Sequence, residues 1–239
     1  MQWWEKLDYD DNPFTTNPKK YTACLVNMDN IIDEIYYRVN AGSLLVIMGH
    51  KGMGRTSLLM RTAEMFGGKG RVAYVDCAKI RLRLNITRVL RNKYGFFGRL
   101  FNKMPKGMIL LLDNVQNLSK KNNDRIKYYF DQRYIKSVIF TLKWFSRAKF
   151  SDSLIDRIGD RKVKIEGIDE NDAIQLIRCR IGDSDLLNDE LIVKIFNASG
   201  QNPKALLENC DLLADHAVSK KRNRIQYADL KDILGVGNE

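Results

Sequence analysis

Short apolar runs alternate with segments of helical spacing along the first two thirds of this 239-residue chain. Each run has the length and aliphatic content of a buried strand, and each intervening segment repeats apolar residues every three or four positions. The expected strands are 43–48, 71–76, 107–113, 137–142 and 162–165, and the expected helices between them are 56–66, 86–101, 124–134 and 151–158. This alternation predicts an α/β fold in which a parallel sheet is covered by helices on both faces.

The pattern changes after Gly167. Four amphipathic segments follow with no strand between them, at 169–181, 189–198, 203–217 and 227–234. Asp169 and Asp172 have the spacing of a capping box, and Pro203 stands where the first turn of a helix accepts proline. These signals predict a small all-helical domain, so we expect a core at 1–166 and a helical lid at 167–239.

The composition is that of an ordinary globular protein, with 44% hydrophobic and 29% charged residues. It excludes a collagen, a disulfide-rich miniprotein and a mostly disordered chain. No apolar run approaches the roughly 20 residues that a membrane-spanning helix needs, and the N-terminus lacks the basic-then-apolar order of a signal peptide. We therefore expect a cytoplasmic protein with no membrane partner.

The four cysteines, Cys24, Cys77, Cys179 and Cys210, are far apart, and only two histidines accompany them. They do not have the spacing of a zinc site or of a redox motif. We expect all four to be buried thiols.

Positive charge is concentrated in the middle of the chain. Between Ile80 and Phe150 stand 17 of the 40 lysines and arginines but three of the 29 acidic residues, and the whole chain has a net charge of +11. Clustered cations favour a polyanionic partner such as nucleic acid, because binding releases its counterions. A solvated basic surface without such a partner is the alternative interpretation.

A glycine-rich segment follows the first expected strand. Residues 49–56 read GHKGMGRT, which fits the phosphate-binding pattern GxxxxGK[ST] except that Arg55 replaces the lysine. The glycines let backbone N–H groups turn inward, and the helix that follows adds the positive end of its dipole. Thr56 offers a hydroxyl to Mg²⁺. The pattern predicts a nucleotide phosphate site, and a glycine-rich turn without a ligand is the alternative.

Arg55 changes the chemistry expected of this loop. Lysine delivers a compact charge to the phosphates, whereas a guanidinium is broad, planar and always protonated. A guanidinium still binds phosphate, even through two parallel hydrogen bonds, but its width crowds the γ-phosphate or the metal. We therefore expect nucleotide binding to survive better than hydrolysis. Lys51 is not expected to replace the missing lysine, because side chains within such a loop usually point outward.

Asp113 and Asn114 follow the third apolar run. An acid at the carboxyl end of a buried strand beside a phosphate loop is placed to hold Mg²⁺, and an Asp that caps the next turn is the alternative. The residue after such an acid is commonly Glu, which orients the attacking water. Asn114 cannot accept a proton, so that step lacks its base.

Three further positions carry polar groups suited to a phosphate site. Thr141 ends the fourth expected strand, and Lys204 lies at the start of a helix in the small domain. Arg157 precedes the last strand and can reach a neighbouring subunit's nucleotide, where it would stabilise charge on the γ-phosphate. A surface ion pair with Asp156 or Asp160 is the alternative interpretation of Arg157.

These elements, in this order, resemble an AAA+ ATPase, and in particular the branch of origin-recognition and helicase-loading initiators of archaea and eukaryotes. The resemblance covers nearly the whole chain, from Asn12 onward, and implies a P-loop AAA+ core with a helical lid that binds ATP or ADP with Mg²⁺. The implied nucleotide-binding residues are Pro13 and Phe14 beside the adenine, then Gly49, Lys51, Gly52, Met53, Gly54, Arg55, Thr56, Ser57 and Lys204. The implied catalytic residues are Asp113 and Asn114 as the Walker B pair, Thr141 as sensor 1 and Arg157 as the arginine finger, with Thr56 and Asp113 on Mg²⁺.

Three positions depart from the residues usual in this family. They are Arg55 for Lys, Asn114 for Glu and Lys204 for Arg. Losing one electrostatic or acid–base contact lowers kcat by about 10²-fold or more. We therefore expect a nucleotide-binding protein in DNA replication or another DNA transaction, with weak or absent ATPase activity.

The initiators of this branch usually continue into a winged-helix domain, whereas this sequence ends at Glu239, soon after the lid. We therefore expect DNA contacts to come from the ATPase body, without sequence reading. The candidate DNA-binding residues are Arg88, Arg91, Lys93, Arg99 and Lys103. A helix that buries its aromatic residues and shows these charges to water is the alternative.

Two rival functions follow from the same residues. One is a nucleotide-independent, basic DNA-binding or scaffold subunit that keeps the AAA+ fold. The other is an active motor or loader whose partner subunit is catalytically complete, with Arg157 acting across the interface. A homo-oligomer and a heteromeric AAA+ assembly are both compatible with the sequence.

Overall fold

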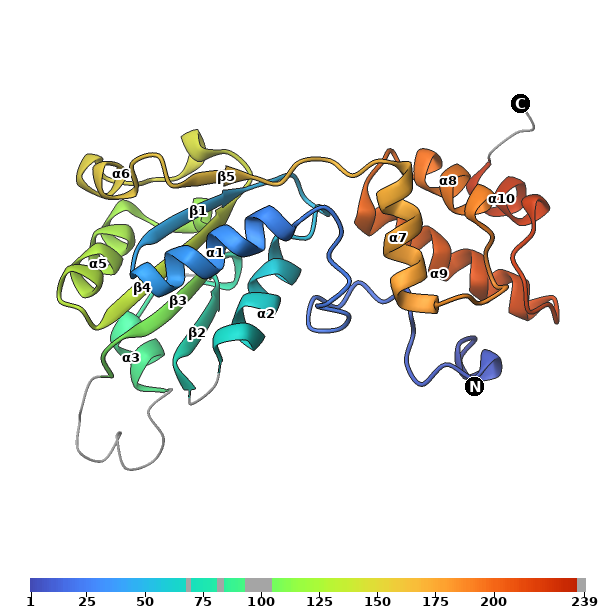
Figure 1. The fold of residues 1–239 in the computed structure, drawn as a ribbon, viewed down its shortest axis with the longest axis horizontal. Coiled ribbons are helices and arrows are strands. Elements are labelled where there is room, and N and C mark those ends of the chain that lie inside the picture. The colour runs from blue at the N-terminus through green and yellow to red at the C-terminus, as the bar shows by residue number, and fades with distance from the viewer. Residues whose placement is uncertain (68–69, 81–83, 93–104, 236–239) are drawn as a thin grey trace. The chain divides into compact units, whose positions relative to one another are not determined.

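The computed structural model describes residues 1–67, 70–80, 84–92 and 105–235, and its elements are labelled in Figure 1. The chain divides into two compact units. The helical unit comprises Met1–Asn27, Gly52–Gly54 and Glu166–Glu239, and the sheet unit comprises Met28–Lys51 and Arg55–Ile165. Residues 1–27 group with the C-terminal helices instead of with the sheet, and the expected domains at 1–166 and 167–239 stay a prediction.

The sheet unit contains a five-stranded parallel sheet. Its strands are β1 (Leu44–Met48), β2 (Val72–Asp76), β3 (Met108–Asp113), β4 (Ile135–Leu142) and β5 (Lys162–Lys164), in the spatial order β2-β3-β4-β1-β5. Each strand coincides with an expected apolar run to within two residues, because β1, β3 and the greater part of β4 are apolar stretches that are buried on both faces. The predicted α/β fold class is confirmed.

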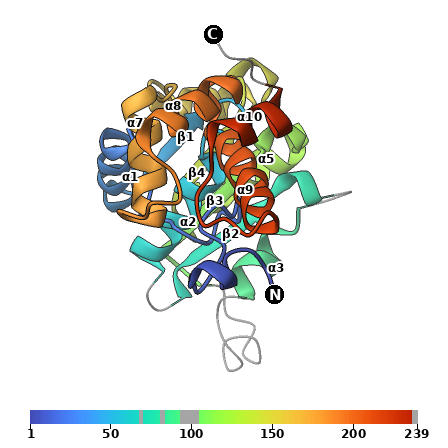
Figure 2. The ribbon, with the colours of Figure 1, turned by 90° about the vertical axis from the view of Figure 1, so that its right-hand side faces the viewer.

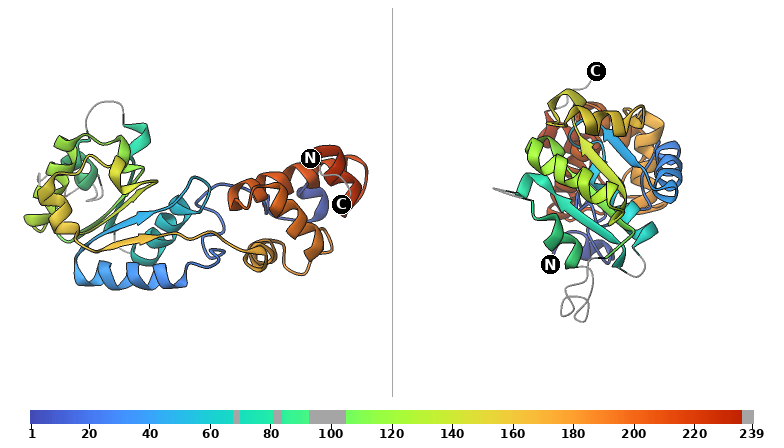
Figure 3. Two further views of the ribbon diagram at one scale, coloured as in Figure 1. Left: turned by 90° about the horizontal axis from the view of Figure 1, so that it is seen from above. Right: turned by 90° about the vertical axis from the view of Figure 1, so that its left-hand side faces the viewer.

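Helices cover both faces of this sheet (Figure 3). They are α1 (Asp29–Ala41), α2 (Arg55–Phe66), α3 (Ile86–Arg91), α5 (Lys120–Asp131) and α6 (Asp152–Ile158), with 3₁₀ turns at Cys77–Lys79, Val115–Asn117 and Phe145–Arg147. Helix α1 was not expected from the sequence. Ser119 caps α5, so this helix begins four residues before the expected segment, and the expected helix at 86–101 is described only as far as residue 92.

Alternate side chains of the strands face opposite helical layers. Leu44 and Val46 on β1 belong to one core cluster with Ile126 of α5 and Leu154 of α6. The intervening residues of β1 are also fully buried, and α1 and α2 pack against β1, β4, β2 and β3 on the other side. Because the strands run parallel, the carboxyl ends of the central strands lie at the same edge of the sheet.

The helical unit contains α7 (Glu170–Ile181), α8 (Asp189–Ala198), α9 (Pro203–Ser219) and α10 (Tyr227–Leu234), which are labelled in Figure 2. The bounds of α8 and α10 are those expected from the sequence. Asp169 and Asp172 form the capping box of α7, and Pro203 occupies the first turn of α9. Strong local start signals therefore fix where these helices begin.

The N-terminal segment, which includes a 3₁₀ turn at Glu5–Leu7, packs into the core of the helical unit. Trp3 is 3% exposed and stacks on Phe14 at 5.6 Å, and its indole Nε1 donates to Asp211 of α9 at 2.7 Å. The buried guanidinium of Arg180 donates to the backbone oxygens of Pro13 and Thr15. Burial lowers the pKa of Arg180 to about 10. These contacts attach the first residues of the chain to α7 and α9.

Two cysteines were wrongly expected to be free thiols. Cys24 and Cys179 form a disulfide that joins the N-terminal segment to α7, whereas Cys77 and Cys210 are free and buried. Sequence separation of 155 residues hid this pairing, because only folding brings the two side chains together. Structural disulfides persist in oxidising compartments and in intracellular proteins of hyperthermophiles, so the cytoplasmic localisation stays a prediction.

Candidate functional site

The glycine-rich segment joins the end of β1 to the start of α2, as expected. Gly52 and Gly54 have φ angles of 88° and 84°. Side chains disfavour this region of backbone space, whereas glycine adopts it freely. Such backbone conformations at neighbouring residues are a feature of anion-binding nests, in which backbone N–H groups point toward the ligand. Arg55, Thr56 and Ser57 form the first turn of α2.

Asp113 is the centre of a buried group of hydroxyl donors at the end of β3. Its side chain is almost fully buried, and Oδ2 accepts from Thr56 Oγ1 at 2.6 Å and from the Tyr74 hydroxyl at 3.3 Å. Its Oδ1 accepts from Thr141 Oγ1. Burial and the negative charge of Asp113 raise the pKa of Tyr74 well above its usual value. The folded chain therefore brings together three predicted residues, Thr56, Asp113 and Thr141, and adds Tyr74.

Arg55 lies beside this group and has an unsatisfied donor. Its Nη2 donates to Asn114 Oδ1 at 3.5 Å, while its buried Nη1 has no hydrogen-bond partner among the described residues. Burial lowers the pKa of Arg55, and the negative charge of Asp113 opposes that shift. A partly buried guanidinium in which one buried N–H group lacks an acceptor is the kind of group that an anionic ligand satisfies.

Asn114 has a backbone conformation that few side chains adopt. Its φ is 57°, in the left-handed region, where Asn is better tolerated than most residues. Its backbone N–H donates to Thr141 Oγ1 at 3.3 Å, and its side-chain Nδ2 donates to Asp76 Oδ1 at 3.2 Å. Residues in such strained conformations cluster at functional sites.

Asp76 was missed by the sequence-based site prediction. It ends β2 and stands in register with Asp113 on the neighbouring strand. The signal was present, because the expected strand at 71–76 ends in an acid just as the strand at 107–113 does. What the sequence could not show is that β2 and β3 are adjacent, which places both acids at the same edge of the sheet.

Arg157 is paired within its own chain. Its Nη2 donates to Asp131 Oδ1 of α5 at 2.6 Å and its Nε donates to the same oxygen at 3.2 Å. The Arg157 side chain is about half exposed, at 53%. An ion pair was the expected alternative, but with Asp156 or Asp160 as its partner. The role of arginine finger stays a prediction.

The residues predicted for the adenine and the lid lie in the helical unit. Pro13 and Phe14 are buried there, and Lys204 at the start of α9 pairs with Glu208 at 3.2 Å. The pairing follows from i,i+4 spacing on one helix and leaves Lys204 partly exposed. Nucleotide contacts by these three residues stay predictions.

The predicted DNA-binding residues are described only in part. Arg88 is exposed on α3, and Arg91 at the end of α3 is partly buried. Lys93, Arg99 and Lys103 lie outside the described residues.

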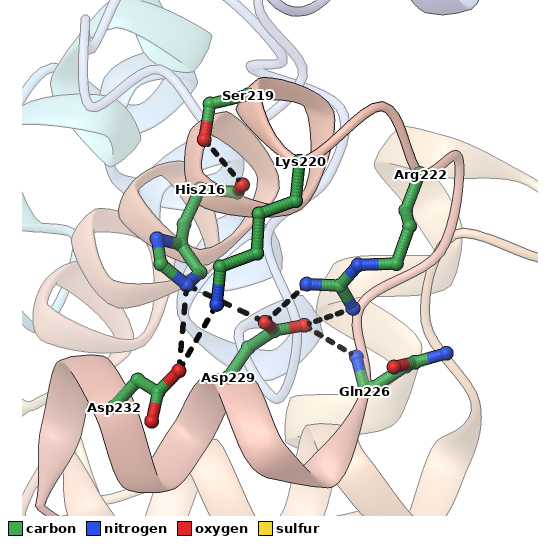
Figure 4. Close-up of polar contacts among 7 residues, drawn as sticks. All are labelled: His216, Ser219, Lys220, Arg222, Gln226, Asp229 and Asp232. Carbon is green, nitrogen blue, oxygen red and sulfur yellow. Dashed lines mark hydrogen bonds and ion pairs between the residues drawn. The ribbon is translucent and has the colours of Figure 1, made fainter.

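A second group of titratable side chains connects α9 and α10 (Figure 4). His216 Nε2 lies 3.5 Å from Asp229 and 3.8 Å from Asp232. Two cations already balance these carboxylates, because Arg222 binds Asp229 with two hydrogen bonds and Lys220 lies 3.1 Å from Asp232. A divalent ion would add uncompensated positive charge, so the group stabilises the packing of α9 on α10.

Sequence comparisons do not place the chain in a family. No protein-family model matches it. No curated protein sequence matches it either. In the part of the chain that the structure describes, no helix is both long and apolar enough to cross a membrane.

Comparison with solved structures shows the class of fold. Domain III of the replication initiation protein DnaA from Thermotoga maritima aligns with a TM-score of 0.68 at 20% identity, covering 92% of this chain and 97% of that one. Cdc6p from Pyrobaculum aerophilum aligns with a TM-score of 0.69 at 16% identity, over 94% of this chain and 70% of that one. A chain of the Drosophila ORC bound to DNA aligns with a TM-score of 0.65 at 12% identity, over 92% and 63%.

These similarities span both units of the chain and are similarities of fold. The chain has the fold of the AAA+ ATPases. The resemblance drawn from the sequence motifs is thereby confirmed at the level of fold.

Proposed function

We propose that this chain is an adenine-nucleotide-binding protein of the AAA+ initiator type, which acts in DNA replication or another DNA transaction and hydrolyses ATP weakly. The observation that carries the proposal is the buried Nη1 of Arg55 in the first turn of α2, which has no hydrogen-bond partner in the part of the chain that the structure describes. A phosphate oxygen is the acceptor that satisfies this donor. It would also meet the positive end of the α2 dipole.

The residues present fit a nucleotide phosphate and Mg²⁺. The positive φ angles of Gly52 and Gly54 leave backbone N–H groups available to donate to phosphate oxygens. Thr56 and Asp113, which are hydrogen-bonded to each other, provide the hard oxygen ligands that Mg²⁺ prefers. Bound Mg²⁺ would neutralise part of the phosphate charge. The chain itself holds the backbone donors and the oxygens of Thr56 and Asp113 in place before the nucleotide binds.

Weak hydrolysis is proposed because the side chain after Asp113 is an amide. Asn114 donates and accepts hydrogen bonds but cannot take a proton from water. The guanidinium of Arg55 is held partly by that amide. It is therefore less available than a lysine to stabilise the negative charge that develops on the γ-phosphate during hydrolysis.

Calorimetry with Mg·ATP and Mg·ADP tests the proposal. We expect both nucleotides to bind, and we expect Arg55→Met to weaken binding by about 10- to 100-fold, the value of one to two charge-assisted hydrogen bonds. Arg61→Met is the matched control, because Arg61 lies on the same helix, is 40% exposed and pairs with Glu64. Absence of binding heat with either nucleotide would overturn the proposal.

DNA binding is the second part of the proposed function. It is supported by the basic middle of the sequence and by the exposed guanidinium of Arg88 on α3. We expect a fluorescent duplex to bind with a steep salt dependence, and Arg88→Gln to weaken binding and reduce the salt slope by about 1. Affinity that is the same with and without ATP would favour the nucleotide-independent scaffold instead.

A further inference from the structure

Two acids end the neighbouring strands β2 and β3. Asp76 and Asp113 are in register across this parallel pair, so both leave the sheet at its carboxyl edge. Asp113 is fully engaged by the hydroxyls of Thr56, Tyr74 and Thr141. Among the described residues, the hydrogen bonds to Asp76 come from two N–H groups, those of Ala78 and the Asn114 amide, and both go to Oδ1. The Asp76 side chain is 20% exposed. The second carboxylate of the site is therefore the more accessible one.

Asn114 connects Asp76 to the phosphate-loop helix. Its amide oxygen accepts from Arg55 Nη2 at 3.5 Å and its amide nitrogen donates to Asp76 Oδ1 at 3.2 Å. These two contacts fix which end of the amide faces each partner. A carboxylate at position 114 would instead place two negative oxygens at hydrogen-bond distance, which is unfavourable. Asp76 and Asn114 therefore form a pair of one carboxylate and one amide, in which residue 76 has the carboxylate.

The remaining contacts of Asp76 leave one oxygen weakly engaged. Oδ1 also accepts from the backbone N–H of Ala78 at 3.0 Å, which caps the 3₁₀ turn after β2. Oδ2 lies 3.7 Å from Nζ of Lys79, whose side chain is 84% exposed. An ion pair at that distance with so exposed a partner is weak. Oδ2 can therefore accept a hydrogen bond from water.

We propose that Asp76 supplies the carboxylate that orients the attacking water, in the role that Asn114 cannot fill; this inference rests on the proposed nucleotide site. The water oxygen forms a bond to the γ-phosphorus as the bond from that phosphorus to the β,γ-bridging oxygen breaks. ADP leaves with the electron pair, and the water proton passes to Asp76 Oδ2 before its release to solvent. The products are ADP, inorganic phosphate and one proton.

The first test is Asp76→Asn in the full chain, with single-turnover hydrolysis of γ-labelled ATP as one readout and ATP affinity as the other. Asparagine keeps the oxygen that accepts from Ala78 and Asn114, so the fold is preserved. We expect hydrolysis to fall about 100-fold, the scale of a lost general base, while the Kd for ATP changes less than about threefold. Asp76→Glu, which keeps a carboxylate, should retain measurable hydrolysis.

Lys79→Gln is the matched control. It removes the cation beside Oδ2 but leaves the carboxylate and the hydrogen bonds of Oδ1 in place. We expect wild-type hydrolysis from this variant. If Lys79→Gln lowered the rate of hydrolysis as much as Asp76→Asn does, hydrolysis would depend on the ion pair between the two residues and not on the carboxylate. That result would overturn the proposal.

A second readout does not depend on hydrolysis. Asn114→Asp places two carboxylates in contact and should lower Tm by several degrees, whereas the exchange variant Asp76→Asn/Asn114→Asp restores one amide and one carboxylate and should recover most of that loss. Equal Tm values for Asn114→Asp and for the exchange variant would show that the contact between residues 76 and 114 does not form.

Failure of this inference differs from failure of the proposed function. If wild type binds no ATP, the proposed function falls. If wild type binds ATP and Asp76→Asn hydrolyses it as fast, or if neither protein hydrolyses it at all, the nucleotide site stands and the role of Asp76 is refuted.

Discussion

The disulfide between Cys24 and Cys179 joins the N-terminal segment to helix α7 across 155 residues of chain. It closes a loop that contains the whole sheet unit, since both cysteines belong to the helical unit. In the chain-entropy account, a cross-link over a loop of this length restricts the unfolded chain by about 5 kcal/mol. The bond therefore holds residues 1–27 to the helices against a large entropic cost.

Reduction should weaken this attachment. We expect dithiothreitol, or the Cys24→Ser/Cys179→Ser variant, to lower the unfolding free energy by about 2–5 kcal/mol, because the unfolded chain regains its freedom. Thermal unfolding followed by tryptophan fluorescence measures the change, since Trp3 lies in the same core.

The double variant is its own control for this experiment, because its Tm should not respond to reductant. Thiol titration of denatured wild type should give two free thiols before reduction and four after it. Four thiols without reduction would contradict the disulfide.

Thr141→Val should destabilise the chain by about 1–3 kcal/mol. Valine has the same shape but leaves the buried Asp113 Oδ1 without its hydroxyl donor, and it removes the acceptor for the backbone N–H of Asn114. Urea unfolding measures the loss. Thr141→Ser keeps the hydroxyl and should lose much less, so equal losses from the two variants would show that packing, and not the hydrogen bonds, is responsible.

Cys77 should make the chain less stable as pH rises above 9. Burial raises the pKa of its thiol from 9.0 to about 12, with smaller contributions from Asp113 and Asp76. The unfolded thiol releases its proton first, so stability is fully present below pH 9 and is lost as pH rises toward 12. We expect the unfolding free energy to fall by about 1 kcal/mol between pH 8 and pH 10 through this group. The difference between wild type and Cys77→Ala in urea unfolding isolates it, and parallel pH profiles would refute the assignment.

Arg157→Ala separates the two interpretations of that residue. The ion pair with Asp131 is half exposed, so its loss should change the unfolding free energy by less than about 1 kcal/mol. If Arg157 acts on a neighbouring subunit's nucleotide, ATP turnover at high protein concentration should fall about 10²-fold while ATP affinity is kept. Asp131→Asn is the control, because it breaks the pair and leaves the guanidinium in place. Unchanged turnover in Arg157→Ala would assign the residue to the ion pair alone.

The amino-acid sequence alone was enough to predict the fold class and the position of each strand. Continuous aliphatic runs specify buried parallel strands wherever they occur, and the capping residues at Asp169 and Asn188 specify helix starts through bonds to their own backbone. The glycine-rich turn between β1 and α2 was also predictable, because its glycines and Thr56 lie within eight consecutive residues. Helix α1, in which Ile35 and Val39 are buried, was not predicted although its apolar residues also recur at helical spacing.

Tertiary structure decided which distant residues meet. The order β2-β3-β4 places Asp76 beside Asn114 and Thr141 beside Asp113, and neither adjacency can be read along the chain. Cys24 forms a disulfide with Cys179, and Trp3 donates a hydrogen bond to Asp211, because the N-terminal segment buries its aromatic rings among the last helices. Local signals act over a few residues through backbone geometry, whereas these contacts arise when apolar surfaces far apart in sequence leave water together.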